Sequence, residues 1–148
     1  MTANVEVDLG VRNLTGRYCD AVARFDVDAF AACWSSEATW TAGDLLPIQG
    51  RDAIVRVFTK LRAPFHYCIQ ELLSGVVTPT GEGSDAIAQW QVRELQWRED
   101  GTVGCVIGTY ADRIVMEDAA WCFADRHFTL VYRGPVDLTG PLSVRQTL

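Results

Sequence analysis

Residues 11–34, VRNLTGRYCDAVARFDVDAFAACW, contain the pattern that decides the fold. From Val11 to Phe25 apolar side chains recur every three or four residues, which predicts a helix with one buried stripe. The stripe consists of Leu14, Tyr18, Ala21, Val22 and Phe25. Asp26 and Asp28 follow at once, and a side-chain oxygen at such a position caps the free amides of a new helix. The stretch therefore predicts a long amphipathic helix and then a short helix over residues 27–34.

Outward from this stretch, the chain changes from helical to strand-like patterns at Pro64. Residues 38–41 predict a short strand, and apolar positions over 54–61 predict a third helix that Pro64 ends. Segments 65–77, 86–97, 104–115 and 121–132 have the β-branched and aromatic content of strands. Asp100-Gly101 predicts a tight turn, and Gly75 a bulge or bend. Helices first and strands later predict an α+β fold rather than alternating βαβ units.

Length and charge set limits on the class of protein. The 148 residues are enough for one domain, 1–148, with irregular tails expected at 1–10 and 134–148. A net charge of -6 is unlike the basic surface of nucleic-acid-binding proteins, so no nucleic-acid partner is expected. The sequence has neither a long apolar run nor a signal-peptide pattern. We therefore expect no membrane association and a cytoplasmic location.

The five cysteines are scattered, and none forms a Cys-x-x-Cys pair. This spacing predicts free thiols, mostly buried, rather than a disulfide framework or a zinc site. The chain has only two histidines, His66 and His127, too few for an obvious metal cluster. We therefore expect no metal and no cofactor.

A long, bent antiparallel sheet after two or three helices favours a cone-shaped half-barrel. Such a sheet cannot be filled by its own side chains, so a helix closes it and a cavity often remains. Residues 16–30 (GRYCDAVARFDVDAF), 37–40 (EATW) and 50–54 (GRDAI) closely resemble the opening of SnoaL-like proteins. Residues 108–113 (GTYADR) and 117–126 (EDAAWCFADR) are similar to their closing hairpin. The resemblance spans nearly the whole chain and implies the cystatin-like, nuclear transport factor 2-like fold.

Ketosteroid isomerases are relatives within that superfamily, and part of their site has counterparts here. The resemblance places Tyr18 where those enzymes keep an oxyanion-stabilising tyrosine, and Asp112 where they keep a protonated acid. In those enzymes apolar surroundings raise the pKa of this acid, so that it stays neutral and can donate a hydrogen bond. The family's aspartate base would follow the strand at 38–41, but Ala42 occupies that position and Asp44 comes two residues later. The resemblance therefore does not imply the simple isomerase mechanism.

A resemblance to scytalone dehydratase and related dehydratases makes His66 a candidate catalytic residue. The resemblance places this residue where those enzymes keep a pocket histidine, and an imidazole suits proton removal beside a carbonyl at neutral pH. The helical Tyr-Asp pair of the dehydratase is replaced by Val22-Ala23, so its complete site is not reproduced.

These comparisons and the strand patterns give a predicted site. The expected catalytic residues are His66, Tyr18 and Asp112. The expected ligand-binding residues are Trp40, Trp90, Glu94, Tyr110 and Arg126. Structural alternatives remain for several of them, because Tyr18 could be a core aromatic, His66 a rim residue and Asp112 a partner of Arg126. Strand alternation sends Arg126 and His127 to opposite faces, and it leaves open which of them reaches the pocket.

The predicted function is a pocket protein for a small apolar, aromatic or polycyclic molecule. The favoured interpretation is a cofactor-independent lyase or isomerase that acts on a cyclic, carbonyl-bearing compound. The alternative is a non-catalytic ligand-binding protein of the same fold. A third interpretation is a structural subunit that pairs through the outer face of the sheet, and a homodimer is expected because members of the resembled family commonly dimerise.

Overall fold

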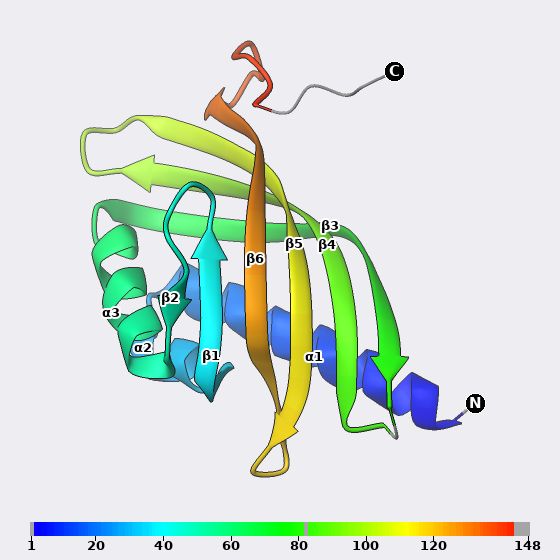
Figure 1. Ribbon diagram of the computed structural model, residues 1–148. Coiled ribbons are helices and arrows are strands. Elements are labelled where there is room, and N and C mark those ends of the chain that lie inside the picture. Colours follow the sequence, from blue (N-terminus) through cyan, green and yellow to red (C-terminus); the bar gives the residue numbers. More distant parts are fainter. Residues whose placement is uncertain (1, 82, 144–148) are drawn as a thin grey trace.

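The computed structural model describes residues 2–81 and 83–143, which form three helices and a six-stranded sheet (Figure 1). Helix α1 spans Thr2–Arg24, α2 spans Val27–Ala31 and α3 spans Arg51–Arg62. The expectation of an irregular tail at 1–10 is wrong for residues 2–10, because they form the first turns of α1. Val7 and Val11 extend the buried stripe toward the N-terminus and hold these turns against the sheet.

The boundary between α1 and α2 shows why the two helices separate. Phe25 adopts a left-handed conformation with φ 54°, and the Asp26 amide donates to the Ala21 carbonyl at 2.9 Å. This pattern is a Schellman ending, which satisfies free carbonyls of the last turn. The Asp26 Oδ1 then accepts from the Ala29 amide at 2.9 Å and caps α2, as predicted.

The strands are β1 (Trp34–Ala42), β2 (Ile48–Gln49), β3 (Phe65–Thr80), β4 (Asp85–Arg98), β5 (Val103–Glu117) and β6 (Ala120–Pro135). They form one sheet in the order β2-β1-β6-β5-β4-β3. All neighbours are antiparallel except β1 and β6, which pair in parallel. The expected tail at 134–148 begins inside β6, and 136–143 form turns and one bridge between Leu142 and Tyr132, whereas 144–148 lie outside the described residues.

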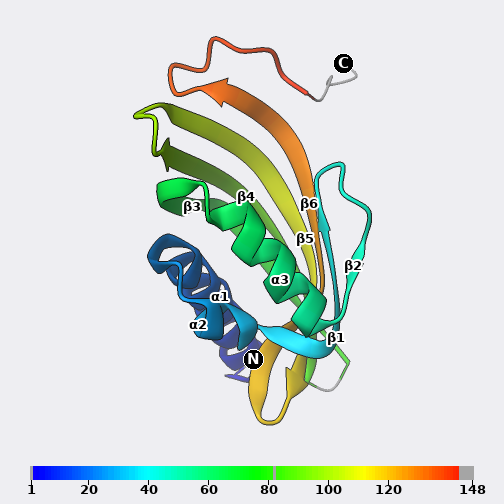
Figure 2. The same cartoon turned by 90° about the vertical axis from the view of Figure 1, so that its left-hand side faces the viewer.

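The sheet is bent, and the helices lie on its concave side (Figure 2). Register shifts interrupt the β3–β4 pairing between Leu72 and Ser74, close to the bend expected at Gly75. Gly75 itself is needed because a Cβ there would lie 2.1 Å from Cε3 of Trp90. The predicted α+β half-barrel is therefore confirmed, with a mostly antiparallel sheet.

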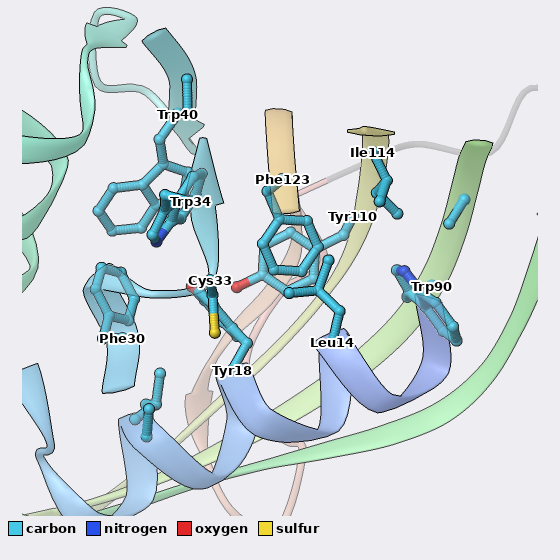
Figure 3. Packing of buried hydrophobic residues seen from close by; sticks show 14 of the residues in the cluster. Leu14, Tyr18, Phe30, Cys33, Trp34, Trp40, Trp90, Tyr110, Ile114 and Phe123 are labelled. Carbon is cyan, nitrogen blue, oxygen red and sulfur yellow. The ribbon is translucent and has the colours of Figure 1, made fainter. Parts of the chain in front are cut away.

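An aromatic core fills one end of the concave side (Figure 3). Phe30 of α2 stacks on Phe58 of α3 with ring centroids 3.7 Å apart, and Trp34 packs against Phe123 of β6 at 5.5 Å. Along β4, Ala86, Ala88 and Trp90 belong to this packed end, and the later inward-facing residues line a cavity. The core therefore closes one end of the half-barrel and leaves the other end hollow.

Candidate functional site: a cavity on the concave face of the sheet

The hollow end contains a cavity of about 520 Å³ between the sheet and helices α1 and α3. Its lining comes from α1, β1, α3 and the four strands β3 to β6, so residues far apart in the sequence meet there. Apolar side chains such as Val22, Trp40, Phe58 and Phe128 form much of the wall. A space of this size with mostly apolar walls is typical of sites for small organic molecules.

A hydrogen-bonded carboxylate, Glu94, lies in the sheet wall of this cavity. Glu94 faces Gln70 directly across the β3–β4 pairing. The Gln70 Nε2 donates to Glu94 Oε2 at 2.6 Å, and the Gln96 amide donates to Glu94 Oε1. Gln70 Nε2 also lies 3.4 Å from the Tyr110 hydroxyl. Two amide donors thus hold the carboxylate in one orientation inside the cavity.

Two tyrosines, Tyr18 of α1 and Tyr110 of β5, line the cavity beside this group, with ring centroids 6.3 Å apart. Figure 3 shows them projecting from opposite elements into the same space. Burial raises the pKa of Tyr110 to about 12, although the charge of Arg126 acts in the opposite direction. Burial also raises the pKa of Tyr18 well above its ordinary value. Both phenols are therefore protonated near neutral pH and can donate hydrogen bonds.

A buried ion pair supports the wall behind the two tyrosines. Arg126 is fully buried, and its guanidinium lies 3.6 Å from the ring centroid of Tyr110 and 4.2 Å from that of Tyr18. Its Nε lies 3.4 Å from Asp112 Oδ1, and Trp90 Nε1 donates to Asp112 Oδ2 at 3.0 Å. Burial raises the pKa of Asp112 to about 6, opposed by the charge of Arg126. Arg126, Asp112 and Trp90 are not part of the cavity lining.

His66 lies outside the cavity, and the expected convergence of His66 with Tyr18 and Asp112 does not occur. Its side chain is 75% exposed, and its Nδ1 is 3.9 Å from Glu99 Oε1 at the surface. The preceding residue, Phe65, occupies the inward position and lines the cavity. His127 is exposed as well, so Arg126 is the inward-facing member of that pair.

The structure thus separates the predicted site residues into two groups. Tyr18, Trp40, Glu94 and Tyr110 line the cavity. The residues that do not line it are Trp90, Asp112 and Arg126, which are buried beside it, and His66, which is at the surface. Gln70 and Gln96 are additional polar lining residues that sequence reasoning missed. Strand alternation from Val92 and Glu94 could have identified Gln96, since it lies two residues further along the same face.

The described cysteines are all free, and burial raises the pKa of the Cys68 thiol, which lines the cavity, well above its ordinary value. A thiol with such a pKa remains protonated near neutral pH and is a poor nucleophile. Among residues 2–81 and 83–143, no three metal-ligating side chains of the His, Cys, Asp or Glu types gather at one point. Within the same residues, no helix combines the length and the apolar character needed to cross a membrane.

Comparisons with known proteins place this geometry in a family. A model of the SnoaL-like domain matches residues 3–127. No curated protein matches the chain. A solved structure of a proposed scytalone dehydratase from Novosphingobium aromaticivorans aligns with a TM-score of 0.82 and 15% identity, covering 95% of this chain and 100% of that one.

Two further structures are similar to the same extent. A proposed aromatic ring hydroxylase of Novosphingobium aromaticivorans has a TM-score of 0.79 and 24% identity, covering 94% of this chain and 93% of that chain. The hexachlorocyclohexane dehydrochlorinase LinA-type3 of Novosphingobium barchaimii has a TM-score of 0.79 and 14% identity, with 96% and 97% covered. At these identities the similarity establishes the shared nuclear transport factor 2-like fold, whereas the chemistry has to be argued from the cavity.

Proposed function

This chain belongs to the SnoaL-like domain family, and we propose that it is a cofactor-independent lyase or isomerase acting on a small cyclic carbonyl compound. The observation that carries the proposal is the oriented carboxylate of Glu94 in a largely apolar cavity, beside two protonated phenols. The names of two similar structures, a dehydratase and a dehydrochlorinase, denote elimination enzymes and support a lyase-type reaction.

The proposed reaction begins with removal of a proton from the carbon next to the substrate carbonyl. Glu94 accepts this proton, and the electron pair of the broken C–H bond moves toward the carbonyl oxygen to form an enolate. The hydroxyls of Tyr18 and Tyr110 donate hydrogen bonds to that oxygen and stabilise its negative charge. The resemblance to ketosteroid isomerases led us to expect donors at Tyr18 and Asp112, and in this proposal Tyr110 takes the place of Asp112, which does not line the cavity.

The enolate can then react in two ways that both restore Glu94. In a lyase reaction the electron pair expels a hydroxyl group from the neighbouring carbon, and protonated Glu94 returns its proton to this leaving group. In an isomerase reaction the same proton goes to a more distant carbon of the conjugated system, and the double bond moves. Both routes conserve protons and electrons within the substrate and Glu94, so neither consumes an external oxidant or reductant.

Deuterium incorporation tests the shared first step without knowledge of the final product. Cyclic ketones are incubated with the protein in deuterated buffer, and proton NMR follows exchange at the carbon beside the carbonyl. Wild type should accelerate this exchange, and Glu94→Gln should lower the rate on the order of 10² to 10⁴-fold, the usual contribution of a general base. Glu99→Gln removes an equal charge at the surface turn and should match wild type.

The main competing function is binding without catalysis, and the position of the histidines favours it. Both histidine side chains are exposed, and neither lines the cavity. The relevant outcome is a ketone that binds wild type in calorimetry without any acceleration of its deuterium exchange over the rate in buffer alone. This result would support binding without catalysis and reject the lyase or isomerase proposal. Equal exchange by wild type and Glu94→Gln would instead reject Glu94 as the base.

We also propose that two copies of the chain associate through the outer face of the sheet. Support comes from apolar side chains exposed on β3 and β4, of which Tyr67 is 43%, Val76 66% and Ile87 48% exposed. Solvent exposure of several large apolar groups on one sheet face is typical of an interface. Analytical ultracentrifugation should give a dimer that Val76→Glu converts to a monomer. A wild-type monomer at micromolar concentration would contradict this proposal.

A further inference from the structure

A smaller cavity of about 280 Å³ adjoins the main one and shares Gln96 and Arg133 with it. It lies where β4 ends and β5 begins, and its other walls include Arg98 and backbone at Gly104 and Gly134. Two arginines thus border a space that continues from the proposed substrate site. Their charge contrasts with the net charge of -6 of the whole chain.

The guanidinium of Arg98 is held in place by its surroundings. Its Nη2 donates to Gln96 Oε1 at 3.4 Å, and the group lies 5.6 Å from the ring centroid of Phe65. A Cβ at Gly104 would come within 2.9 Å of Arg98 Nη1, so glycine at this position leaves room for the guanidinium. An arginine positioned in this way loses less conformational entropy when it binds an anion.

Among the described residues, no carboxylate oxygen lies within 4.0 Å of the guanidinium nitrogens of Arg98 or Arg133. Across the described residues, the ion pairs within 4.0 Å involve other basic side chains. Gln96 separates Arg98 from Glu94, because its amide nitrogen donates to the carboxylate and its oxygen accepts from the arginine. The glutamine therefore keeps the proposed base and the arginine apart, and Arg98 retains donors for another anion.

We propose that this smaller cavity binds a carboxylate of the substrate, so that the compound in the main cavity is a cyclic keto acid. The inference rests on the proposed function and specifies its substrate class. Gln96 and Glu94 are two residues apart on one strand, which separates their Cα atoms by about 7 Å. A six-membered ring with its substituents can span this distance. Its carboxylate would then contact Arg98 and Arg133, with the carbon beside the carbonyl near Glu94.

The planar guanidinium supplies the recognition. It donates parallel hydrogen bonds to both oxygens of a carboxylate, and these charge-assisted bonds are stronger than bonds to a neutral ester. At a partly solvated position, one such bond contributes enough binding free energy for the acid to bind about tenfold more tightly than the ester. The apolar rings of Phe58 and Phe128 line the main cavity and suit the uncharged part of the ligand.

A matched pair of ligands tests the inference, namely a cyclohexanone with a carboxylate on its ring and the methyl ester of the same compound. Calorimetry should show the acid binding wild type about tenfold more tightly than the ester. Arg133→Gln and Arg98→Gln should remove this preference, because they weaken binding of the acid more than binding of the ester. Arg113→Gln removes an exposed charge on β5 outside both cavities and should behave as wild type.

Equal affinity of wild type for acid and ester would overturn the inference, as would an acid preference that survives in both Arg133→Gln and Arg98→Gln. Thermal melts of the variants confirm that they remain folded. Deuterium exchange measured on the ester tests the proposed reaction separately, because the ester lacks the carboxylate. Suppose that acid and ester bind equally well, but Glu94→Gln slows deuterium exchange of the ester. This result would reject the keto-acid assignment and would still support the proposed reaction.

Discussion

The buried carboxyl of Asp112 should make the protein less stable as the pH rises from about 4 to about 6. Its side chain is fully buried, and burial raises its pKa from the ordinary value of 3.8 to about 6, although Arg126 opposes this change. Between these two values the native state still holds a proton that the unfolded state has already released. The free energy of unfolding must then fall with increasing pH.

The size of the effect follows from the two pKa values. Below 3.8 Asp112 is protonated in both states, so its stabilising contribution is fully present there. Above about 6 it is ionised in both states, and that contribution is lost. One pKa unit corresponds to 1.36 kcal/mol, so the complete loss amounts to about 3 kcal/mol. This is a large fraction of the stability of an ordinary domain.

Urea unfolding of wild type and Asp112→Asn at several pH values measures this effect. Asparagine keeps an oxygen that accepts from Trp90 Nε1 but cannot titrate. Asp20 and Asp100 have lowered pKa values, because Arg24 and Thr102 respectively hydrogen-bond to them, and they produce the opposite pH dependence. Their contributions are common to both proteins and cancel in the difference.

The stability of Asp112→Asn relative to wild type should increase by about 3 kcal/mol between about pH 4 and about pH 7. Asp85→Asn removes an exposed carboxylate at the start of β4 and should show no such change relative to wild type. A difference between Asp112→Asn and wild type that stays constant over this range would refute the reasoning. It would mean that Arg126 compensates the burial of the carboxylate completely.

Two backbone predictions can be checked by thermal and chemical unfolding. Gly75→Ala should destabilise the protein by about 1–3 kcal/mol, because the new Cβ would lie 2.1 Å from Cε3 of Trp90. Gly16→Ala, in α1 with no neighbour within 4 Å, should instead stabilise it by up to about 1 kcal/mol, and equal effects would contradict the packing argument. Asp26→Ala removes the cap of the Ala29 amide and should cost about 1 kcal/mol, whereas an unchanged midpoint would show that the cap contributes nothing.

Local patterns predicted most of the fold. The apolar stripe of α1, the Asp26 cap and the turn at Gly101 depend on residues close in sequence, and all three occur. The parallel pairing of β1 with β6 was not predicted, because it joins Trp34 to Phe123 and no local pattern records such a contact. The first turns of α1 were missed because polar residues interrupt the periodicity before Val7.

Placement of the site residues was harder to predict because a shift of one position reverses a side chain. The β3–β4 pairing shifts between Phe65 and Tyr67, and His66 between them points away from the cavity. Along β4 the alternation is regular, and it places Glu94 in the cavity wall. The sequence alone did not determine whether the face of the strand that carries Glu94 is the inner or the outer one. Strands with regular alternation therefore allow prediction of cavity residues, whereas strands with bulges do not.

The ion pair of Arg126 and Asp112 has a consequence for the proposed chemistry. Trp90 Nε1 donates to one carboxyl oxygen of Asp112, Arg126 Nε lies 3.4 Å from the other, and the side chain does not line the cavity, so this acid is not positioned to donate to a ligand there. The charge of Arg126 instead acts on Tyr110, whose pKa it lowers against the larger effect of burial. A cation fixed 3.6 Å from that ring also stabilises negative charge on an oxygen that accepts from the Tyr110 hydroxyl. In the proposed reaction the buried pair therefore assists the enolate through the tyrosines, without contact with the substrate.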